Sequence, residues 1–240
     1  MKFPIALFTV ALVVFTSSFA SAAIIADLDA PASYTLAAVN AAGGIQVGDK
    51  VFSDFGVDST HSVGAIAPAA DTVNVTGVQI DGDYGLRFTG LWSAGGLQLA
   101  DSVIMYKVEA GAPFQITGTT LKMAGYTADN GGHATISTTL YNQDPNLTNT
   151  LSVANAGVYF DSGSGTLKEL VYKAMADQTN LQPVNLSQVW VLNDVGASGG
   201  VDANGISKIS AFYQTFTQVP EPATLAVLGL GGLSLLRRRR

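Results

Sequence analysis

The chain has 240 residues, 18 of them acidic and 12 basic, and it contains no cysteine. The lack of cysteine excludes disulfide bonds, thiol catalysis and cysteine-based metal sites. Residues 23–218 carry 17 acidic and 7 basic side chains, a net charge of −10, because the remaining charges lie in the two terminal segments. A surface of this sign repels phosphate backbones, so we expect no nucleic-acid partner.

The first 22 residues have the pattern of a secretory signal peptide. Lys2 gives a positive start, the run Phe3–Phe19 is mainly apolar, and small residues follow at Ala20, Ser21 and Ala22. We therefore predict a signal helix that signal peptidase removes after Ala22, reading Ala20 and Ala22. The alternative is a buried first helix, but nothing downstream offers a helical neighbour for it.

The part of the chain from residue 23 to 218 is long enough for one domain with a sizeable core. Short runs rich in Val, Ile, Thr and aromatic residues alternate there with turn residues, which predicts strands. The predicted strands are Lys50–Val57, Val73–Ile80, Gly85–Trp92, Ser102–Glu109, Phe114–Met123, Ala134–Tyr141, Leu151–Phe160, Leu167–Met175, Gln188–Asn193 and Ile206–Thr217.

Two local features qualify this strand pattern. The inward side of the second strand shifts at Gly77, which predicts a β-bulge. One short helix is predicted at Thr35–Ala42, ended by Gly43 and Gly44. We predict an all-β fold: a single two-sheet β-sandwich of jelly-roll type, with helices only here, in the signal peptide and in a short C-terminal hydrophobic segment.

The sequence offers few residues for catalysis or metal binding. His61 and His133 lack the spacing of a metal site, and loop positions explain both. Two D-x-D pairs, at residues 27–29 and 81–83, could ligate Ca²⁺, but the chain after Asp81 does not continue as an EF-hand loop. Solvated turns explain these pairs. With no G-x-S-x-G elbow and no Walker A loop, we predict no catalytic residue, no metal site and no cofactor.

Aromatic side chains are the remaining candidates for a binding surface. A line of exposed rings on one sheet face could stack on sugar rings, whereas buried rings would belong to the core. The candidates are Trp92, Tyr106, Tyr126, Tyr141 and Trp190. For the two tryptophans, core packing is the favoured alternative.

The C-terminal segment has three parts in a fixed order. Glu221 lies between Pro220 and Pro222, and Ala223–Leu236 then follows without a charge. Four arginines end the segment: Arg237, Arg238, Arg239 and Arg240. The apolar part is shorter than the roughly 20 residues of a usual membrane helix. The arginines would hold this end in the cytoplasm, with the body outside.

This segment resembles the PEP-CTERM sorting signal of Gram-negative bacteria, in Val219–Pro222, in the glycines Gly229, Gly231 and Gly232, and in the arginine cluster. Residues 43–57, 85–96, 101–109 and 209–222 are also similar to a recurrent ectodomain of such proteins. The resemblance implies recognition by exosortase, a membrane protease-transpeptidase. It further implies removal of the tail near Pro-Glu-Pro, and delivery from the inner membrane to the cell surface or extracellular matrix.

We therefore divide the chain into a signal peptide (1–22), a β-sandwich ectodomain (23–218) and a sorting segment (219–240). The favoured function is a non-enzymatic structural or adhesive component associated with exopolysaccharide, as in a biofilm matrix. One alternative is a carbohydrate-binding module for the cell's own polysaccharide, which needs exposed aromatic rings. Another is a secreted hydrolase, which needs a cleft with convergent carboxylates or a histidine dyad.

Overall fold

A computed structural model describes residues 24–147, 150–162, 166–170 and 186–220. The elements in chain order are β1 (Ile24–Ile25), β2 (Ser33–Thr35), α1 (Leu36–Ala41), β3 (Ile45–Val47), β4 (Lys50–His61), β5 (Asn74–Ile80), β6 (Asp83–Gly95), β7 (Leu99–Ala110), β8 (Phe114–Asp129), β9 (His133–Tyr141), β10 (Ser152–Asp161), β11 (Thr166–Leu170), β12 (Gln188–Ser198) and β13 (Ile206–Pro220). The predicted signal helix and C-terminal hydrophobic helix lie outside the described residues.

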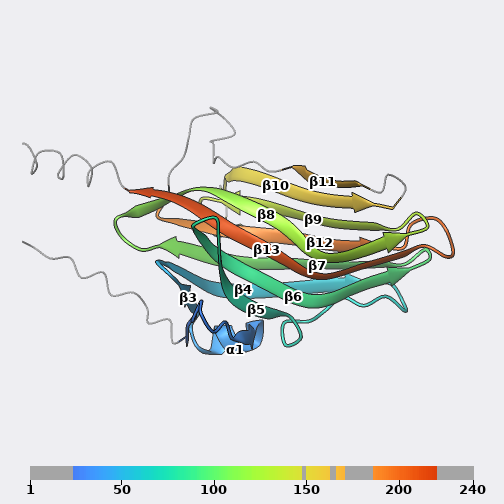
Figure 1. The fold of residues 1–240 in the computed structure, drawn as a ribbon, viewed down its shortest axis with the longest axis horizontal. Helices are drawn as coiled ribbons and strands as arrows, with labels where there is room; N and C mark the ends of the chain where they lie inside the picture. The colour runs from blue at the N-terminus through green and yellow to red at the C-terminus, as the bar shows by residue number, and fades with distance from the viewer. Residues whose placement is uncertain (1–23, 148–149, 163–165, 171–185, 221–240) are drawn as a thin grey trace, which may run out of the picture.

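The strands form two sheets that pack face to face (Figure 1). The larger sheet has the order β1-β3-β4-β7-β12-β9-β10-β11, and the smaller has the order β2-β5-β6-β13-β8. Several connections cross from one sheet to the other, including β4 to β5, β6 to β7 and β12 to β13. The predicted two-sheet β-sandwich with jelly-roll-like crossings is confirmed.

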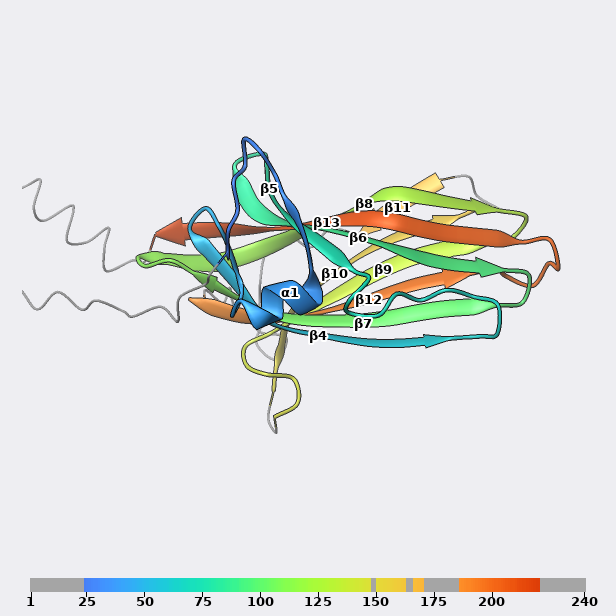
Figure 2. The same ribbon diagram turned by 90° about the horizontal axis from the view of Figure 1, so that it is seen from below.

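The predicted strands are all present among the described residues, and most of them are longer than predicted. β11 matches the start of the predicted strand Leu167–Met175, whose end lies outside the described part. The predicted helix is confirmed as α1, where the Thr35 hydroxyl accepts a hydrogen bond from the Ala38 amide (3.1 Å). The helix packs beside β4 (Figure 2).

The predicted bulge at Gly77 is wrong. β5 pairs with β6 in an unbroken register from Asn74 opposite Thr89 to Ile80 opposite Asp83. A Cβ atom on Gly77 would lie 2.6 Å from the Ala26 Cβ and 3.0 Å from a methyl group of Val47. The glycine therefore lets the N-terminal part of the chain lie close against β5, and it does not interrupt the strand.

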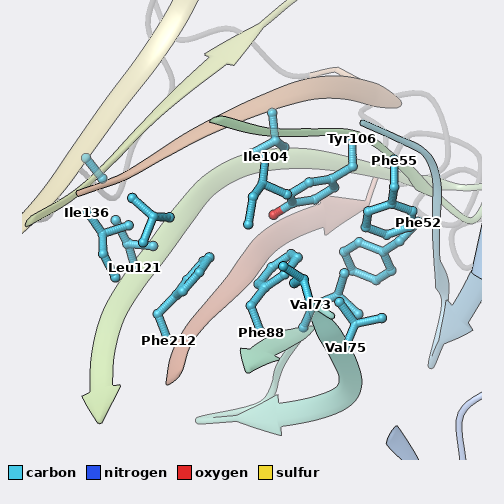
Figure 3. Packing of buried hydrophobic residues seen from close by; sticks show 14 of the residues in the cluster. Phe52, Phe55, Val73, Val75, Phe88, Ile104, Tyr106, Leu121, Ile136 and Phe212 are labelled. Carbon is cyan, nitrogen blue, oxygen red and sulfur yellow. The ribbon is translucent and has the colours of Figure 1, made fainter. Parts of the chain in front are cut away.

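The space between the sheets is filled by aromatic and aliphatic side chains (Figure 3). Phe88 stacks on Phe212, with ring centroids 4.7 Å apart, and Phe52 contacts Phe216 at 5.9 Å. Tyr106 lies among these rings and is fully buried. With no cysteine in the chain, this packing is the main source of stability.

One buried hydrogen-bond network joins the two sheets inside this core. The Gln214 side chain on β13 accepts from the Tyr106 hydroxyl (2.6 Å) and from the Asn193 amide (2.8 Å). Its own amide donates to the hydroxyls of Thr119 (3.2 Å) and Thr138 (3.0 Å). Because a buried polar group needs a partner, this network fixes the position of one sheet over the other.

Candidate functional site on the outer face of the larger sheet

Strand alternation creates an outer face on the larger sheet. On β7, Ile104, Tyr106 and Val108 are buried between the sheets, so the intervening Met105 and Lys107 project outward and are partly exposed. The neighbouring strands β12 and β9 follow the same alternation. The pairing register therefore decides which outward side chains meet on this face.

Two aromatic side chains are direct cross-strand neighbours there. Trp190 on β12 lies opposite Tyr141 on β9 and opposite Lys107 on β7. Both rings are partly exposed. The Lys107 ammonium group is held by Asp54 (2.9 Å) and Glu109 (3.1 Å), so its charge is already paired. The result is an aromatic platform beside a neutralised cation, and we call Trp190 and Tyr141 the aromatic pair.

Two carboxyl groups lie farther along the same strands. Asp194 on β12 pairs with Val103, and Asp101 on β7 pairs with Gly196, so the two aspartates are diagonal neighbours. Gly196 carries no side chain, and its missing Cβ would lie 3.7 Å from the Asp101 carboxylate, so Asp101 can extend over this position. Partial burial raises the pKa of Asp101 to about 6. A hydrogen bond to Asp194 and the negative charge of Asp194 act in the same direction. We call Asp101 and Asp194 the carboxyl pair.

A hollow of about 390 Å³ adjoins the carboxyl pair. Its lining comes from β9, β10 and β12: Thr135, Ile136, Ser137, Gly157, Val158, Tyr159 and Asp194. Gly157 adds no side chain to it, while Tyr159 supplies a ring and a hydroxyl group. The loop after β9 approaches the same face at β7, where the Asn146 amide lies 3.8 Å from the Met105 sulfur.

His133 lies at the far end of this face, and not in a loop as predicted. It begins β9, stacks on Tyr159 with centroids 6.0 Å apart, and its Nδ1 lies 3.1 Å from the Tyr159 hydroxyl. The Asp161 carboxylate lies 3.4 Å from the same nitrogen. His61 ends β4 and is exposed. Among the described residues the two histidines form no dyad.

The structure divides the five aromatic candidates. Trp92 and Tyr106 are fully buried in the core, so neither can line a binding face. The favoured core packing is therefore confirmed for Trp92, but it is wrong for Trp190, which is partly exposed. Tyr126 packs on Phe160, with centroids 4.8 Å apart. Trp190 and Tyr141 alone meet on one face. The alternation of Trp190 with the apolar Val189 and Val191 was the sequence signal that could have separated it from Trp92.

The D-x-D pairs behave as turns. The Asp27 carboxylate accepts hydrogen bonds from the amides of Asp29 (2.9 Å) and Ala30 (3.2 Å). Asp83 accepts from the Thr217 hydroxyl (2.8 Å). Over the described ranges, no group of three or more His, Asp or Glu side chains is placed to hold a metal ion.

The last strand connects this sandwich to the terminal segment. β13 extends three residues beyond its predicted end at Thr217, and Pro220 still pairs with Phe114 of β8. Val219 and Pro220 are exposed. Residues 218–240 match the PEP-CTERM protein-sorting motif. The chain carries a PEP-CTERM sorting motif. This motif implies exosortase-dependent export, with transient membrane anchoring before processing.

The other sorting residues, Glu221, Pro222 and Arg237–Arg240, and the signal-peptidase residues Ala20 and Ala22, lie outside the described part of the chain. Within the described part, no helix has the length and apolar character needed to cross a membrane.

No curated protein matches this chain. Among solved structures, it is similar to TmCBM61 in complex with β-1,4-galactotriose, at 13% identity and a TM-score of 0.29, covering 68% of this chain and 88% of that one. It is similar to a Cel12A cellulase variant derived from Rhodothermus marinus, at 9% identity, a TM-score of 0.23 and coverages of 69% and 100%. It is also similar to a family 11 carbohydrate-binding module from Clostridium thermocellum, at 9% identity and a TM-score of 0.18, covering 70% of this chain and 89% of that one.

Proposed function

We propose that this protein is a non-catalytic component of the cell surface or extracellular matrix that contacts exopolysaccharide through the outer face of its larger sheet. The aromatic pair carries this proposal. Trp190 and Tyr141 are direct cross-strand neighbours on this face, and both rings are partly exposed. Partly exposed rings on a flat sheet face are suited to stacking on sugar rings.

The polar groups near the aromatic pair would orient such a ligand. From Trp190 to Asp194, β12 runs for about 13 Å, so one extended chain can contact both the aromatic pair and the carboxyl pair. Asp194, Ser137 and Tyr159 line the adjoining hollow and offer hydrogen-bonding groups for sugar hydroxyls. The combination of apolar platform and convergent polar groups is typical of small-ligand sites.

The negative charge of the protein limits which polysaccharides it can bind. Residues 23–218 have a net charge of −10, and Lys107, on the outer face, is already paired with Asp54 and Glu109. An acidic polysaccharide would be repelled, so a neutral or basic one is expected. Salt should accordingly change the binding of a neutral ligand very little.

The carboxyl pair also bears on the hydrolase alternative. A hydrogen bond between the Asp101 and Asp194 side chains contributes to the raised pKa of Asp101, so the two carboxyl groups lie close together. The carboxyl groups of retaining glycosidases lie about 5 Å apart, and those of inverting enzymes lie farther apart. The geometry therefore favours binding over hydrolysis.

Affinity electrophoresis in gels that contain the producing cell's purified exopolysaccharide would test the proposal. Trp190→Ala should weaken binding about fivefold, since an aromatic contact is worth about 1 kcal/mol. Tyr213→Ala is the matched control, because Tyr213 is a partly exposed ring on the smaller sheet, beside Arg87. Equal retardation of Trp190→Ala and the wild type would contradict the proposed face, and release of reducing ends would favour a hydrolase.

A further inference from the structure

A buried lysine lies where the two sheets meet, close to the start of the sorting segment. Lys50 begins β4 in the larger sheet, and Gln218 lies near the end of β13 in the smaller sheet. The Lys50 Nζ is 2.8 Å from the Gln218 Oε1 and 3.2 Å from an Asp49 carboxylate oxygen. The Gln218 amide nitrogen donates to the other Asp49 oxygen. The three side chains thus form a closed ring of contacts.

Burial makes the Lys50 ammonium group easier to deprotonate than that of an exposed lysine. The side chain is only 1% exposed, while the Tyr84 ring, 5.3 Å from Nζ, favours the charged form. Burial lowers the pKa of Lys50, and this effect outweighs the opposing effect of the Asp49 carboxylate. A neutral amine is a nucleophile, whereas an ammonium group is not.

Asp49 is placed to move protons between the two nitrogen atoms. One carboxylate oxygen contacts the Lys50 nitrogen, and the other contacts the amide nitrogen of Gln218. A carboxylate in this position can take a proton from the attacking amine and give it to the departing nitrogen. The hydrogen bond from Nζ to Oε1 keeps the amine beside the amide carbonyl group.

We propose that Lys50 and Gln218 form an intramolecular isopeptide bond. Asp49 takes a proton from the Lys50 ammonium group, and the free amine attacks the side-chain carbonyl carbon of Gln218. The new C–N bond forms and the bond from that carbon to the Gln218 nitrogen breaks. This nitrogen leaves as ammonium, with the two protons that Asp49 carries across from the Lys50 nitrogen. Asp49 ends as a carboxylate, and no oxidant, reductant or metal takes part.

Lys107 and Lys122 lack this arrangement. Lys107 contacts the carboxylates of Asp54 and Glu109, and Lys122 is 43% exposed and lies 3.8 Å from the Asp81 carboxylate. Neither has an amide carbonyl group beside its nitrogen in these contacts. The combination of burial, amide and carboxylate therefore distinguishes Lys50 from Lys107 and Lys122.

The bond would join the larger sheet to the last strand of the body. Gln218 lies 168 positions after Lys50 and two before Pro220, so the cross-link would hold the strand that leads into the sorting segment. A chain without cysteine would gain from it the restraint that a disulfide supplies elsewhere. It would also keep β13 in place after removal of the tail.

Peptide mapping by tandem mass spectrometry tests the bond in the mature exported protein. The expected result is one linked peptide pair that contains Lys50 and Gln218 and is lighter by one ammonia molecule. The linked pair distinguishes this loss from succinimide formation at Asn130-Gly131 or Asn204-Gly205, which leaves peptides linear. Recovery of Lys50 and Gln218 only in separate, unmodified peptides would overturn the proposal.

Variants separate the covalent bond from a simple ion pair. Lys50→Arg keeps the charge but cannot supply a neutral amine, and Asp49→Asn removes the proton carrier. Both should abolish the linked peptide. Lys122→Met, which removes a lysine paired with Asp81, should leave it unchanged. Persistence of the ammonia loss at residue 218 in Lys50→Arg would contradict the assignment.

Discussion

The carboxyl pair holds a proton that isolated aspartates would release. Asp101 has a pKa of about 6 in the folded protein, against 3.8 for an unperturbed aspartate. A raised folded pKa gives stability that is fully present below pH 3.8 and is lost as the pH rises through 6. Between pH 3.8 and 6, the outer face of the larger sheet thus becomes more negative and the folded protein becomes less stable.

Asp101→Asn should remove this dependence. An amide can donate to Asp194 at every pH, so at pH 7 the variant should be about 1 kcal/mol more stable than the wild type, allowing for solvent screening. The gain should vanish near pH 4. Thermal unfolding at pH 7 and pH 4 measures this gain in stability. Asp71→Asn, at an exposed loop position, is the control. A variant less stable than the wild type at pH 7 would contradict a shared proton.

Gln214 makes four hydrogen bonds in the sealed core. Gln214→Leu should lower the free energy of unfolding by about 2–4 kcal/mol, because the Tyr106 hydroxyl and the Asn193 amide would lose a buried partner. Urea unfolding measures the loss. Gln79→Leu, at an exposed position on β5, should change it by less than about 0.5 kcal/mol. Equal effects would show that the network adds no stability.

At the scale of elements, β5 shows how a glycine serves packing. The strand keeps its register through Gly77, and the inner side of this position is filled by Ala26 and Val47. Gly77→Ala should therefore destabilise the protein by about 1–3 kcal/mol, since a new Cβ would force the N-terminal strands away. The measurement is again urea unfolding.

Gly157→Ala is the matched control for Gly77→Ala. Gly157 also lies within a strand, but its Cβ would come no closer than 3.7 Å to another heavy atom. Gly157→Ala should therefore lower the free energy of unfolding only slightly. If Gly77→Ala were as stable as Gly157→Ala, the close approach of β1 and β3 to β5 would be wrong.

Alternation along a strand made most of the fold predictable, and it could have predicted more. Trp92 has the same parity as Leu86 and Phe88, so it points into the core, whereas Trp190 has the opposite parity to Val189 and Val191. The short strands β1, β2 and β3 were missed because two or three residues give no periodic signal. Their positions depend on tertiary contacts.

The candidate site could not be predicted in the same way, because it depends on strand order. Asp101 and Asp194 come together only because β7 and β12 are neighbours, although β8 to β11 separate them in the chain. Lys50 and Gln218 meet only because the two sheets close on each other at this end. A single sequence gives strand positions but not this pairing.

At the scale of the whole molecule, the sandwich leads directly into the sorting motif. β13 continues to Pro220, which is exposed and pairs with Phe114, and Glu221 is the next residue. The apolar run begins at Ala223, so little chain separates the folded body from the membrane segment. Glu221 would lie at the membrane–water boundary, where its charge need not be desolvated. The terminal arginines would stay on the cytoplasmic side and so prevent the apolar segment from crossing the membrane.

Glu221→Ala tests whether this glutamate is read as a processing signal. Exosortase processing should slow, so the uncut precursor should accumulate in the inner membrane while surface protein falls. Cell fractionation with an antibody against the body measures both pools. Glu109→Ala, which removes a carboxylate from the outer face of the larger sheet, should mature normally, because Glu109 lies outside the motif at residues 218–240. A simple membrane anchor would not require a charge at residue 221. Normal maturation of Glu221→Ala would therefore show that Pro220-Glu221-Pro222 is not the processing signal.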